Sequence, residues 1–476
     1  MNSESVKTLY KNYTGQMPEE IEKLPLSGSN RQYFRLKGTK QLIGVYGAST
    51  QENNAFVYLA NHFANKGISV PRVYAVSDDR KAYLQDDLGT VTLFDAIAAG
   101  RQCGQFNDTE MHLLKETIRQ LPRIQFEGSK GLNFKQCFPQ SQFDRRCILW
   151  DLHYFKYCFL KAIPIDFDEN RLEDDFEQME RILLTDSFST FMYRDFQSRN
   201  VMICNGHPFF IDFQGGRKGP IYYDLASFLW QAKANFSPNL REELIREYVK
   251  SASTYEILPP YFNESLQHFV LFRTLQVLGA YGFRGYFEKK SHFLQSIPYA
   301  IKNLKQLLQQ RFPEYPYLCK LLHQITDLPL FNNTPQENGL TVRITSFSYK
   351  KGIPGDPSGN GGGYVFDCRA IHNPGKYEAY KQLTGRNDAV IRFLEKDGEI
   401  LTFLEHVYAL ADAHIQRYLE RGFTHLDIHF GCTGGQHRSV YAAEHVAKHV
   451  HERFNVRVLL IHREQQIEET INPCHL

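Results

Sequence analysis

The sequence lacks the features that would place the protein in a membrane or on a nucleic acid. No run of 18 apolar residues occurs that could span a bilayer. Residues 1–10 are polar and contain neither an apolar segment nor a small-residue cleavage site. The formal net charge is only +2, so no global basic field exists to attract nucleic acid or lipid. We therefore expect a cytoplasmic protein with no membrane partner.

Cysteine provides no scaffold in this chain, and internal repeats are absent. The nine cysteines are scattered from Cys103 to Cys474, with neither paired metal-ligand spacing nor a disulfide framework. Most of them are expected to be reduced, small, buried residues. A length of 476 residues exceeds what one core usually organises, so two or three domains are expected.

Two aspartates seventeen residues apart are the strongest chemical signal. Asp195 lies in Tyr-Arg-Asp-Phe-Gln-Ser-Arg-Asn, and Asp212 lies in Phe-Ile-Asp-Phe-Gln-Gly-Gly. Phosphoryl transfer needs one carboxylate to accept the proton of the attacking hydroxyl, and an amide plus a second carboxylate to hold magnesium. Asp195 suits the first role, and Asn200 and Asp212 suit the second. The pattern predicts a kinase-type site that uses ATP and Mg²⁺.

A segment rich in proline, asparagine and glycine divides the chain. Residues 326–340 show neither helical nor strand periodicity, and we interpret them as a linker. Before the linker, residues 1–325 contain a small mixed lobe to about residue 90 and then a long helix-rich lobe. After it, residues 341–476 are numerous enough for an independent domain.

The small lobe is expected to form a nucleotide-binding sheet. Alternating apolar residues predict a hairpin of strands 32–36 and 42–46, a helix 51–66 that stops at Gly67, and strands 70–74 and 82–84. The small polar residues Ser27, Gly28 and Ser29 precede the hairpin, where backbone N–H groups could close over phosphates. Residues 85–89 would connect the lobes and place Asp86 and Leu88 beside an adenine ring.

The same residues resemble a known family. Asp195, Asn200 and Asp212, with Gly219-Pro220 and residues 223–226, look like the aminoglycoside-phosphotransferase-like kinases over residues 1 to about 325. Residues 30–35, 86–89 and 211–225 are most similar to the anomeric N-acetylmuramate/N-acetylglucosamine kinases of cell-wall sugar recycling. The resemblance implies that Asp195 orients or deprotonates the anomeric hydroxyl of an amino sugar, that Asn200 and Asp212 bind magnesium, and that the product is a sugar 1-phosphate.

Two positions depart from the family pattern. Tyr193 stands where most relatives have histidine, and its hydroxyl could still brace the loop by a hydrogen bond. The strand 42–46 has no lysine for the α- and β-phosphates. Arg31 or Arg35 could supply that charge, or both could be surface residues. A regulatory adapter that binds nucleotide without turnover therefore remains the alternative to an enzyme.

The C-terminal domain contains a second motif. Residues 425–430 alternate as a strand, and Gly-Cys-Thr-Gly-Gly-Gln-His-Arg-Ser (431–439) then opens a helix. A glycine-bearing loop between a strand and a helix aims backbone N–H groups at one point, which favours an anion, and Arg438 adds a guanidinium. Cys432 and Arg438 also have the spacing of thiolate phosphatases, which makes a kinase and phosphatase in one chain a third hypothesis. Such a reaction needs a general-acid aspartate that the sequence does not reveal, so Cys432 is either a nucleophile or a buried apolar residue.

This domain resembles the C-terminal domain of the RNase adapter RapZ over residues 342 to about 465. The resemblance rests on residues 346–354, 365–369, 373–374, 383–385, 431–440 and 462–463. It implies a phosphosugar-binding fold that recognises an effector such as glucosamine 6-phosphate. The expected phosphate contacts are Thr433, Gly434, Gly435, His437, Arg438 and Ser439. RapZ's P-loop domain is replaced here by the kinase, and residues 464–469 are acidic, which argues against RNA binding.

Together these features predict an α+β, protein-kinase-like bilobal domain followed by a separate α/β domain. The expected function is ATP- and magnesium-dependent phosphorylation of an amino sugar, with the second domain sensing an amino-sugar phosphate. His425, Asp427 and His429 share a strand face, but alternate residues lie about 7 Å apart, so a hydrogen-bonded face is favoured over a metal site. The sequence leaves the oligomeric state open.

Overall fold

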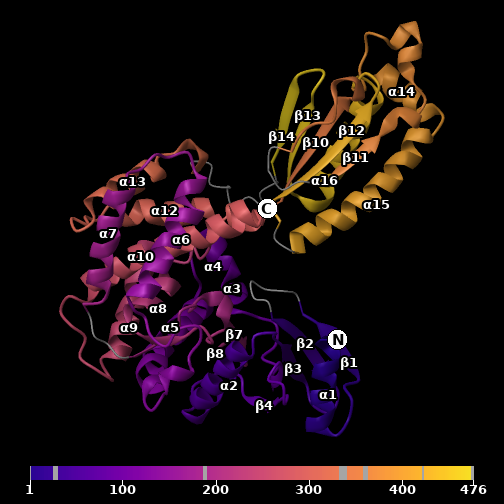
Figure 1. Cartoon of the computed structure of the whole chain (residues 1–476). Coiled ribbons are helices and arrows are strands. Elements are labelled where there is room, and N and C mark those ends of the chain that lie inside the picture. The colour runs from indigo at the N-terminus through magenta and orange to yellow at the C-terminus, as the bar shows by residue number, and fades with distance from the viewer. Residues whose placement is uncertain are drawn as a thin grey trace. The chain divides into compact units, whose positions relative to one another are not determined.

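The structure, a computed structural model, describes residues 2–24, 31–185, 190–331, 340–356, 363–420 and 423–472. The chain divides into two compact units, Met1–Thr334 and Pro335–Leu476 (Figure 1). Each unit has its own hydrophobic core. Ser27, Gly28 and Ser29 lie outside the described residues, as do positions 332–339 of the expected linker. Within the described ranges, no helix is both long and apolar enough to cross a bilayer.

The first unit begins with a five-stranded antiparallel sheet in the order β1-β2-β3-β5-β4. Its strands are β1 (Glu20–Lys23), β2 (Gln32–Lys37), β3 (Leu42–Tyr46), β4 (Val73–Val76) and β5 (Ala82–Asp86). The predicted hairpin is confirmed, with Gln32 opposite Tyr46 and Leu36 opposite Leu42. The predicted helix is α2 (Thr50–Asn65), whose first turn is capped by the side chain of Ser49.

Two parts of this lobe differ from the expectation. The strand predicted at 70–74 is β4, which begins at Val73 rather than Val70, because Pro71 has no N–H to donate to the ladder. A helix that the sequence analysis did not predict, α1 (Asn2–Thr14), packs against β3 and β5. Its Val6 sits against Gly44 of β3, where a Cβ would lie only 2.0 Å from the Val6 side chain. The glycine is therefore required by this close packing.

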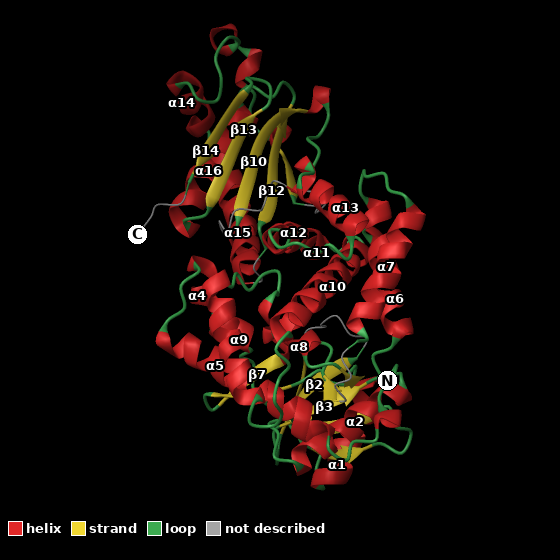
Figure 2. Ribbon diagram, turned by 90° about the vertical axis from the view of Figure 1, so that its left-hand side faces the viewer, coloured by secondary structure: helices red, strands yellow, loops and turns green. Residues whose placement is uncertain are grey.

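Helices form the larger lobe of the first unit, as predicted. They are α3 (Leu93–Ala96), α4 (Ala98–Cys103), α5 (Asp108–Pro122), α6 (Arg145–Cys158), α7 (Glu169–Leu183), α8 (Tyr222–Leu229), α9 (Pro238–Ala252), α10 (Phe262–Gly282), α11 (Ser291–Leu294), α12 (Ile297–Leu307) and α13 (Pro316–Thr326). Figure 2 shows α10 running through the middle of this group, and it contacts α6, α8 and α12. Gly279 and Gly282 of α10 allow the approach, since a Cβ on either would meet the backbone of α6 or its C-cap at under 3 Å.

Two small antiparallel sheets lie where the lobes meet. One pairs β6 (Thr190–Met192) with β9 (Arg217–Gly219), and the other pairs β7 (Val201–Cys204) with β8 (His207–Phe210). The segment between β6 and β7 carries Asp195 and Asn200, and the segment between β8 and β9 carries Asp212. The short strands thus bring two segments of the predicted motif into the same region.

The second unit is a mixed five-stranded sheet with helices. Its strands are β10 (Thr341–Ser348), β11 (Tyr364–Asp367), β12 (His425–Cys432), β13 (Arg457–His462) and β14 (Ile467–Ile471), in the order β11-β12-β10-β13-β14. All pairs are parallel except β13 with β14. Its helices are α14 (Asp388–Lys396), α15 (Glu399–Glu420) and α16 (Arg438–Phe454), and α16 packs on β10, β12 and β13. The predicted strand and helix around residues 425–454 are confirmed.

Candidate functional site

Asp195 is presented on a loop that two buried carboxylates hold in place. Asp224 in α8 accepts hydrogen bonds from the backbone N–H groups of Tyr193 (2.7 Å) and Arg194 (2.9 Å). Asp224 is fully buried, and burial raises its pKa to about 7. Asp151 pairs with the Arg194 guanidinium at 2.7 Å. Arg194 has a φ of +82°, so the loop turns sharply there and exposes the next side chain, Asp195.

The Tyr193 side chain joins this loop to the segment of Asp212. Its hydroxyl donates to the carbonyl oxygen of Ile211, the residue before Asp212. A second link runs in the same direction, because the N–H of Ile211 donates to the Asn200 carbonyl at 3.0 Å. The Tyr193 hydroxyl thus makes the kind of bracing hydrogen bond that the sequence analysis considered possible at this position.

Asp195, Asn200 and Asp212 converge. The amide nitrogen of Asn200 donates to the backbone carbonyl of Asp195 at 2.9 Å. The amide oxygen of Asn200 is therefore the atom that could bind a cation. Asp212 has a φ of +65°, and Gln214 donates to its carboxylate at 2.6 Å. Burial, and then the negative charge of Asp195, raise the pKa of Asp212. The two carboxylates are thus close enough to repel each other, and a bound cation would relieve that repulsion.

A cavity of about 310 Å³ adjoins this group. Its lining combines apolar side chains of the small lobe with the predicted cation ligands: Leu24, Tyr33, Ile43, Phe56, Tyr83, Gln85, Asp86, Asp87, Leu88, Gly89, Arg199, Asn200, Met202, Ile211, Asp212 and Gln214. Asp86 and Leu88, which the sequence analysis placed beside an adenine ring, both line this cavity. The Asp86 carboxylate itself is engaged by the Arg72 N–H (2.9 Å) and the Tyr74 hydroxyl (2.6 Å), so it shapes the wall of the cavity.

The two candidate arginines have different surroundings. Arg31, just before β2, is 2% exposed and pairs with Glu52 of α2 at 3.3 Å. Its positive charge opposes the rise in the pKa of Asp212, so it lies in the electrostatic field of the site. Arg35 is instead held by both oxygens of Asp87, at 2.7 and 3.2 Å, and by the Gly89 carbonyl. Neither arginine is a surface residue, and Arg31 is the one whose charge reaches Asp212.

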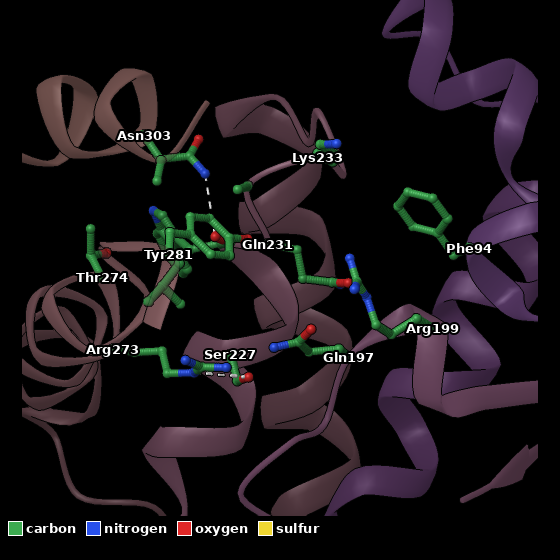
Figure 3. Close-up of a pocket in the computed structure, with 14 residues that line it drawn as sticks. Phe94, Gln197, Arg199, Ser227, Gln231, Lys233, Arg273, Thr274, Tyr281 and Asn303 are labelled. Atoms are coloured by element: carbon green, nitrogen blue, oxygen red, sulfur yellow. Dashed lines mark hydrogen bonds between the residues drawn. The ribbon is translucent and has the colours of Figure 1, made fainter. Parts of the chain in front are cut away.

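Figure 3 shows a second, small pocket of the first unit, with a volume of about 30 Å³. Its lining side chains come from the turn before β7, from α8 and the loop after it, and from α10 and α12. Phe94 of α3 completes the lining. Three of these side chains are cationic, namely Arg199, Lys233 and Arg273. Arg273 lies 3.8 Å from the Asp195 carboxylate. Arg273 therefore links the lining of this pocket to Asp195.

In the second unit, the loop of residues 433–437 lies at one edge of the sheet. The parallel strands β10, β12 and β13 end there at Ser348, Cys432 and His462. Thr433 and Gly434 are exposed. Gly435 has a φ of +65°, and a Cβ there would lie 2.5 Å from the Glu464 side chain. The loop therefore offers exposed backbone at the start of α16, and its geometry depends on Gly435.

The three other side chains that were predicted to contact phosphate are buried within the domain. His437, Arg438 and Ser439 are all buried. The His437 ring lies 2.9 Å from the Tyr380 carbonyl. Arg438 donates through one nitrogen to the carbonyls of Arg369 and Ile371. These side chains anchor the loop to its neighbours.

Cys432 is buried beneath the same loop. Its sulfur accepts the N–H of Gly435 at 3.2 Å and lies 3.1 Å from the Ser439 hydroxyl. Burial alone would raise the pKa of the thiol, but the hydrogen bonds from Ser439 and backbone N–H groups lower it below its usual value. Asp427, in the same strand β12, pairs with Arg343 of β10 at 2.6 Å. The Cys432 thiol and the Asp427 carboxylate are therefore both engaged in contacts within the domain.

Comparison with known proteins identifies the family. The model of the phosphotransferase enzyme family matches residues 20–261, just over half of the chain. The chain belongs to this phosphotransferase family. Its first unit has the protein-kinase-like fold of aminoglycoside phosphotransferases, and a separate RapZ-like C-terminal domain follows it, as predicted. The model of the RapZ C-terminal domain matches residues 340–466.

Curated relatives match only part of this phosphotransferase. A nucleotide-binding protein of Xanthomonas campestris pv. campestris is 34% identical over 141 residues, which cover 30% of this chain and 47% of the relative. One of Cereibacter sphaeroides is 43% identical over 109 residues, which cover 23% of this chain and 34% of the relative. The chain thus spans less than half the length of these two relatives.

Solved structures of kinases are similar to a little under two thirds of the chain. Choline kinase LicA from Streptococcus pneumoniae is 13% identical with a TM-score of 0.45, covering 63% of this chain and 97% of that chain. An aminoglycoside phosphotransferase homologue from Ralstonia eutropha is 9% identical with a TM-score of 0.47, covering 65% of this chain and 99% of that chain.

The sequence analysis assigned no role to four residues around the phosphotransferase site, Glu52, Asp151, Asp224 and Arg273, although Asp224 lies in the segment 223–226 that carries the family resemblance. Glu52 lies in the first turn of a helix that was predicted, but nothing in the sequence shows which strand that turn faces. Arg273 had a usable signal, because a lone arginine in the apolar run of α10 has to find partners inside the fold.

Proposed function

We propose that this phosphotransferase transfers the terminal phosphoryl group of ATP to the anomeric hydroxyl of an amino sugar, N-acetylmuramate or N-acetylglucosamine. The observation that carries the proposal is the convergence of Asp195 with Asn200 and Asp212, two residues that line the 310 Å³ cavity. An exposed carboxylate beside two cation-binding groups is the set that phosphoryl transfer requires. The choice of an amino sugar rests on the sequence resemblance.

The described residues fit a magnesium ion. Asn200 offers an amide oxygen and Asp212 a carboxylate, which are the hard oxygen ligands that magnesium prefers. Among the described residues no group of three or more His, Cys, Asp or Glu side chains could hold a metal. That is compatible with magnesium in kinases, where one or two side chains act together with phosphate oxygens and water. When bound, the ion would neutralise charge on the phosphate oxygens.

The residues around this group have distinct tasks. Asp195 accepts the proton of the acceptor hydroxyl and orients its oxygen toward the phosphoryl group. Asp224, Asp151 and Tyr193 hold the loop of Asp195 in place through the contacts described above. The apolar walls of the cavity accommodate the base of the nucleotide. Arg31, fixed by Glu52, contributes positive charge on the phosphate side.

Arg31 and Lys37 make a matched pair for testing the phosphate contact. We expect Arg31→Met to weaken ATP binding about tenfold or more, because one charge-assisted contact to phosphate is lost. Lys37→Met removes an exposed ion pair with Glu20 and lines neither cavity, so ATP affinity should change by less than about threefold. Isothermal titration calorimetry with a nonhydrolysable ATP analogue and Mg²⁺ measures both values. A larger effect from Lys37→Met would contradict the assignment.

The acceptor is tested by a direct assay. The full-length protein is incubated with ATP, Mg²⁺ and single sugars, among them N-acetylmuramate, N-acetylglucosamine, glucosamine and glucose. ADP release that depends on an N-acetylated amino sugar, with an acid-labile sugar 1-phosphate as product, supports the proposal. ADP release only with other acceptors would place the protein elsewhere in the phosphotransferase family.

We further propose that the C-terminal domain senses an amino-sugar phosphate such as glucosamine 6-phosphate. The support is the exposed backbone of Thr433 and Gly434 at the start of the 17-residue helix α16, where N–H groups and the helix dipole favour an anion. His437, Arg438 and Ser439 would then act by holding this loop in shape.

Gly434 provides a clean test of this sensing role. A Cβ at Gly434 meets nothing within 4 Å, so both Gly434→Ala and Gly434→Asp should fold. We expect the aspartate to weaken glucosamine 6-phosphate binding at least about tenfold by like-charge repulsion, and the alanine to leave it nearly unchanged. Calorimetry measures affinity, and kinase rates with and without the ligand report regulation. Equal affinity of the two variants would contradict the site.

A further inference from the structure

We propose that Gln85 reads position 6 of the purine base, so that this phosphotransferase accepts GTP as well as ATP. Position 6 carries an amino group in adenine and a carbonyl oxygen in guanine. The inference rests on the proposed function and concerns its phosphoryl donor, for which that proposal names ATP. It follows from one unpaired amide in the wall of the 310 Å³ cavity.

The side chain of Gln85 points into this cavity. Gln85 belongs to β5, and alternate side chains of a strand point to opposite faces of the sheet. Tyr83 and Gln85 share one face and both line the cavity, whereas Leu84 packs with α1 on the other face. Ile43, which lies opposite Gln85 in the β3–β5 ladder, lines the cavity as well.

The Gln85 amide is buried without a partner for its oxygen. The residue is only 8% exposed, and its amide oxygen has no hydrogen-bond partner among the described residues. A buried polar group in this condition lowers stability unless a ligand supplies the missing partner. The unpaired amide in a cavity wall therefore indicates a hydrogen bond with the nucleotide.

Gln85 lies at the end of the cavity that is away from the proposed magnesium site. Burial raises the pKa of the Tyr83 hydroxyl, and the charges of Arg31 and Asp212 also act on it. Tyr83 is therefore near the phosphate end. Gln85 lies two residues further along β5, about 7 Å away, where the connection 85–89 begins. The connection is the segment that we expect beside the base.

The other ionisable side chains of this connection are already engaged. Two hydrogen bonds described above hold the Asp86 carboxylate. Asp87 is bound by Arg35 and by the Gln41 amide, each at 2.7 Å. Gln85 is therefore the side chain of the connection that remains available to hydrogen-bond a base.

A glutamine amide suits both purines. Its oxygen can accept from the amino group of adenine, and after a half-turn of the amide its nitrogen can donate to the carbonyl oxygen of guanine. Since no described residue holds the Gln85 oxygen, either orientation is open. We expect the wild-type protein to bind ATP and GTP with affinities within about tenfold of each other, a difference of about one hydrogen bond.

Gln85→Met tests this assignment, because methionine has a similar length and no hydrogen-bonding amide. ATP and GTP should each bind about threefold to tenfold more weakly, as expected for one lost hydrogen bond. A nucleotide without a group at position 6, purine riboside triphosphate, should bind this variant and the wild type equally. Gln310→Met is the matched control, since Gln310 is exposed and lines neither cavity, and it should change none of these affinities.

The stability of the same variant supplies an independent readout. The amide oxygen has no partner in the free protein, so its removal leaves no group newly unpaired. The thermal unfolding midpoint of Gln85→Met without nucleotide should equal or exceed that of the wild type. A lower midpoint would show that the amide serves the fold instead of the nucleotide.

Isothermal titration calorimetry with Mg²⁺, nonhydrolysable ATP and GTP analogues and purine riboside triphosphate measures the affinities. Two results would overturn the inference. One is a GTP analogue that binds the wild type more than about tenfold more weakly than the ATP analogue. The other is a Gln85→Met variant that weakens all three nucleotides alike, or none of them. These measurements need no acceptor, so a failure to phosphorylate any sugar overturns the proposed function separately.

Discussion

Replacement of Asp195 by Asn is expected to lower kcat at least about a hundredfold, the usual loss when a general base is removed. The amide keeps the size of the side chain but cannot accept the proton of the acceptor hydroxyl. Because Asp195 is exposed and its loop is held by backbone bonds to Asp224, the fold and the affinity for ATP should remain. Steady-state rates at saturating ATP and sugar measure the effect.

Asp166→Asn is the matched control for this prediction. Asp166 is an exposed loop residue of the same unit and lines neither cavity. Its variant should keep the wild-type rate. An Asp195→Asn variant with kcat within about threefold of the wild type would remove Asp195 from the mechanism. A wild-type protein that binds ATP and never turns it over would favour the adapter hypothesis.

Replacement of Asp212 by Asn is expected to lower kcat by a hundredfold or more as well, but for a different reason. In the proposed mechanism the variant loses the anionic ligand of magnesium, and electrostatic stabilisation of this kind is worth several kcal/mol in transfer reactions. The distinguishing measurement is nucleotide affinity with and without Mg²⁺. In the wild type Mg²⁺ should tighten binding, and in Asp212→Asn it should have little effect.

The Mg²⁺-dependent binding of nucleotide should also change with pH in a defined direction. Burial and the charge of Asp195 raise the pKa of Asp212, so Mg²⁺-dependent binding should be lost as pH falls through that raised value. Asp195→Asn removes one cause of the rise, and the midpoint should move to lower pH in that variant. Asp166→Asn should leave the midpoint in place. A midpoint unmoved by Asp195→Asn would contradict the closeness of the two carboxylates.

The fold was predictable where pattern and turn residues agree. The hairpin β2–β3, helix α2, and the strand and helix that flank residues 433–437 each combine a clear hydrophobic period with a glycine or a cap. Helix α1 was missed because its apolar residues are few, and it is stabilised by packing on the sheet. The start of β4 was predicted three residues too early, at Val70, because Pro71 was ignored.

Within the candidate site, the motif residues were predictable and their supports were not. The spacing of Asp195, Asn200 and Asp212 predicts a kinase-type site from the sequence alone, before any fold is known. Their partners Asp151 and Asp224, and the pairing of Arg31 with Glu52, depend on which helix meets which loop.

The C-terminal motif shows the same limit. Its nine-residue string indicates an anion-binding loop, but it cannot say which side chains face the ligand. The structure places Thr433 and Gly434 outward and uses Arg438 to bind the carbonyls of Arg369 and Ile371. A thiolate mechanism at Cys432 would need that guanidinium for the phosphate oxygens.

Phosphorus NMR of one reaction tests the central claim most directly. The full-length protein is mixed with ATP, Mg²⁺ and N-acetylmuramate, and the spectrum is followed in time. We predict that ATP is converted to ADP while a phosphomonoester at the anomeric carbon appears in equal amount, and that neither change occurs with Asp195→Asn. ATP that stays intact with every amino sugar, or that yields only inorganic phosphate, would contradict the account.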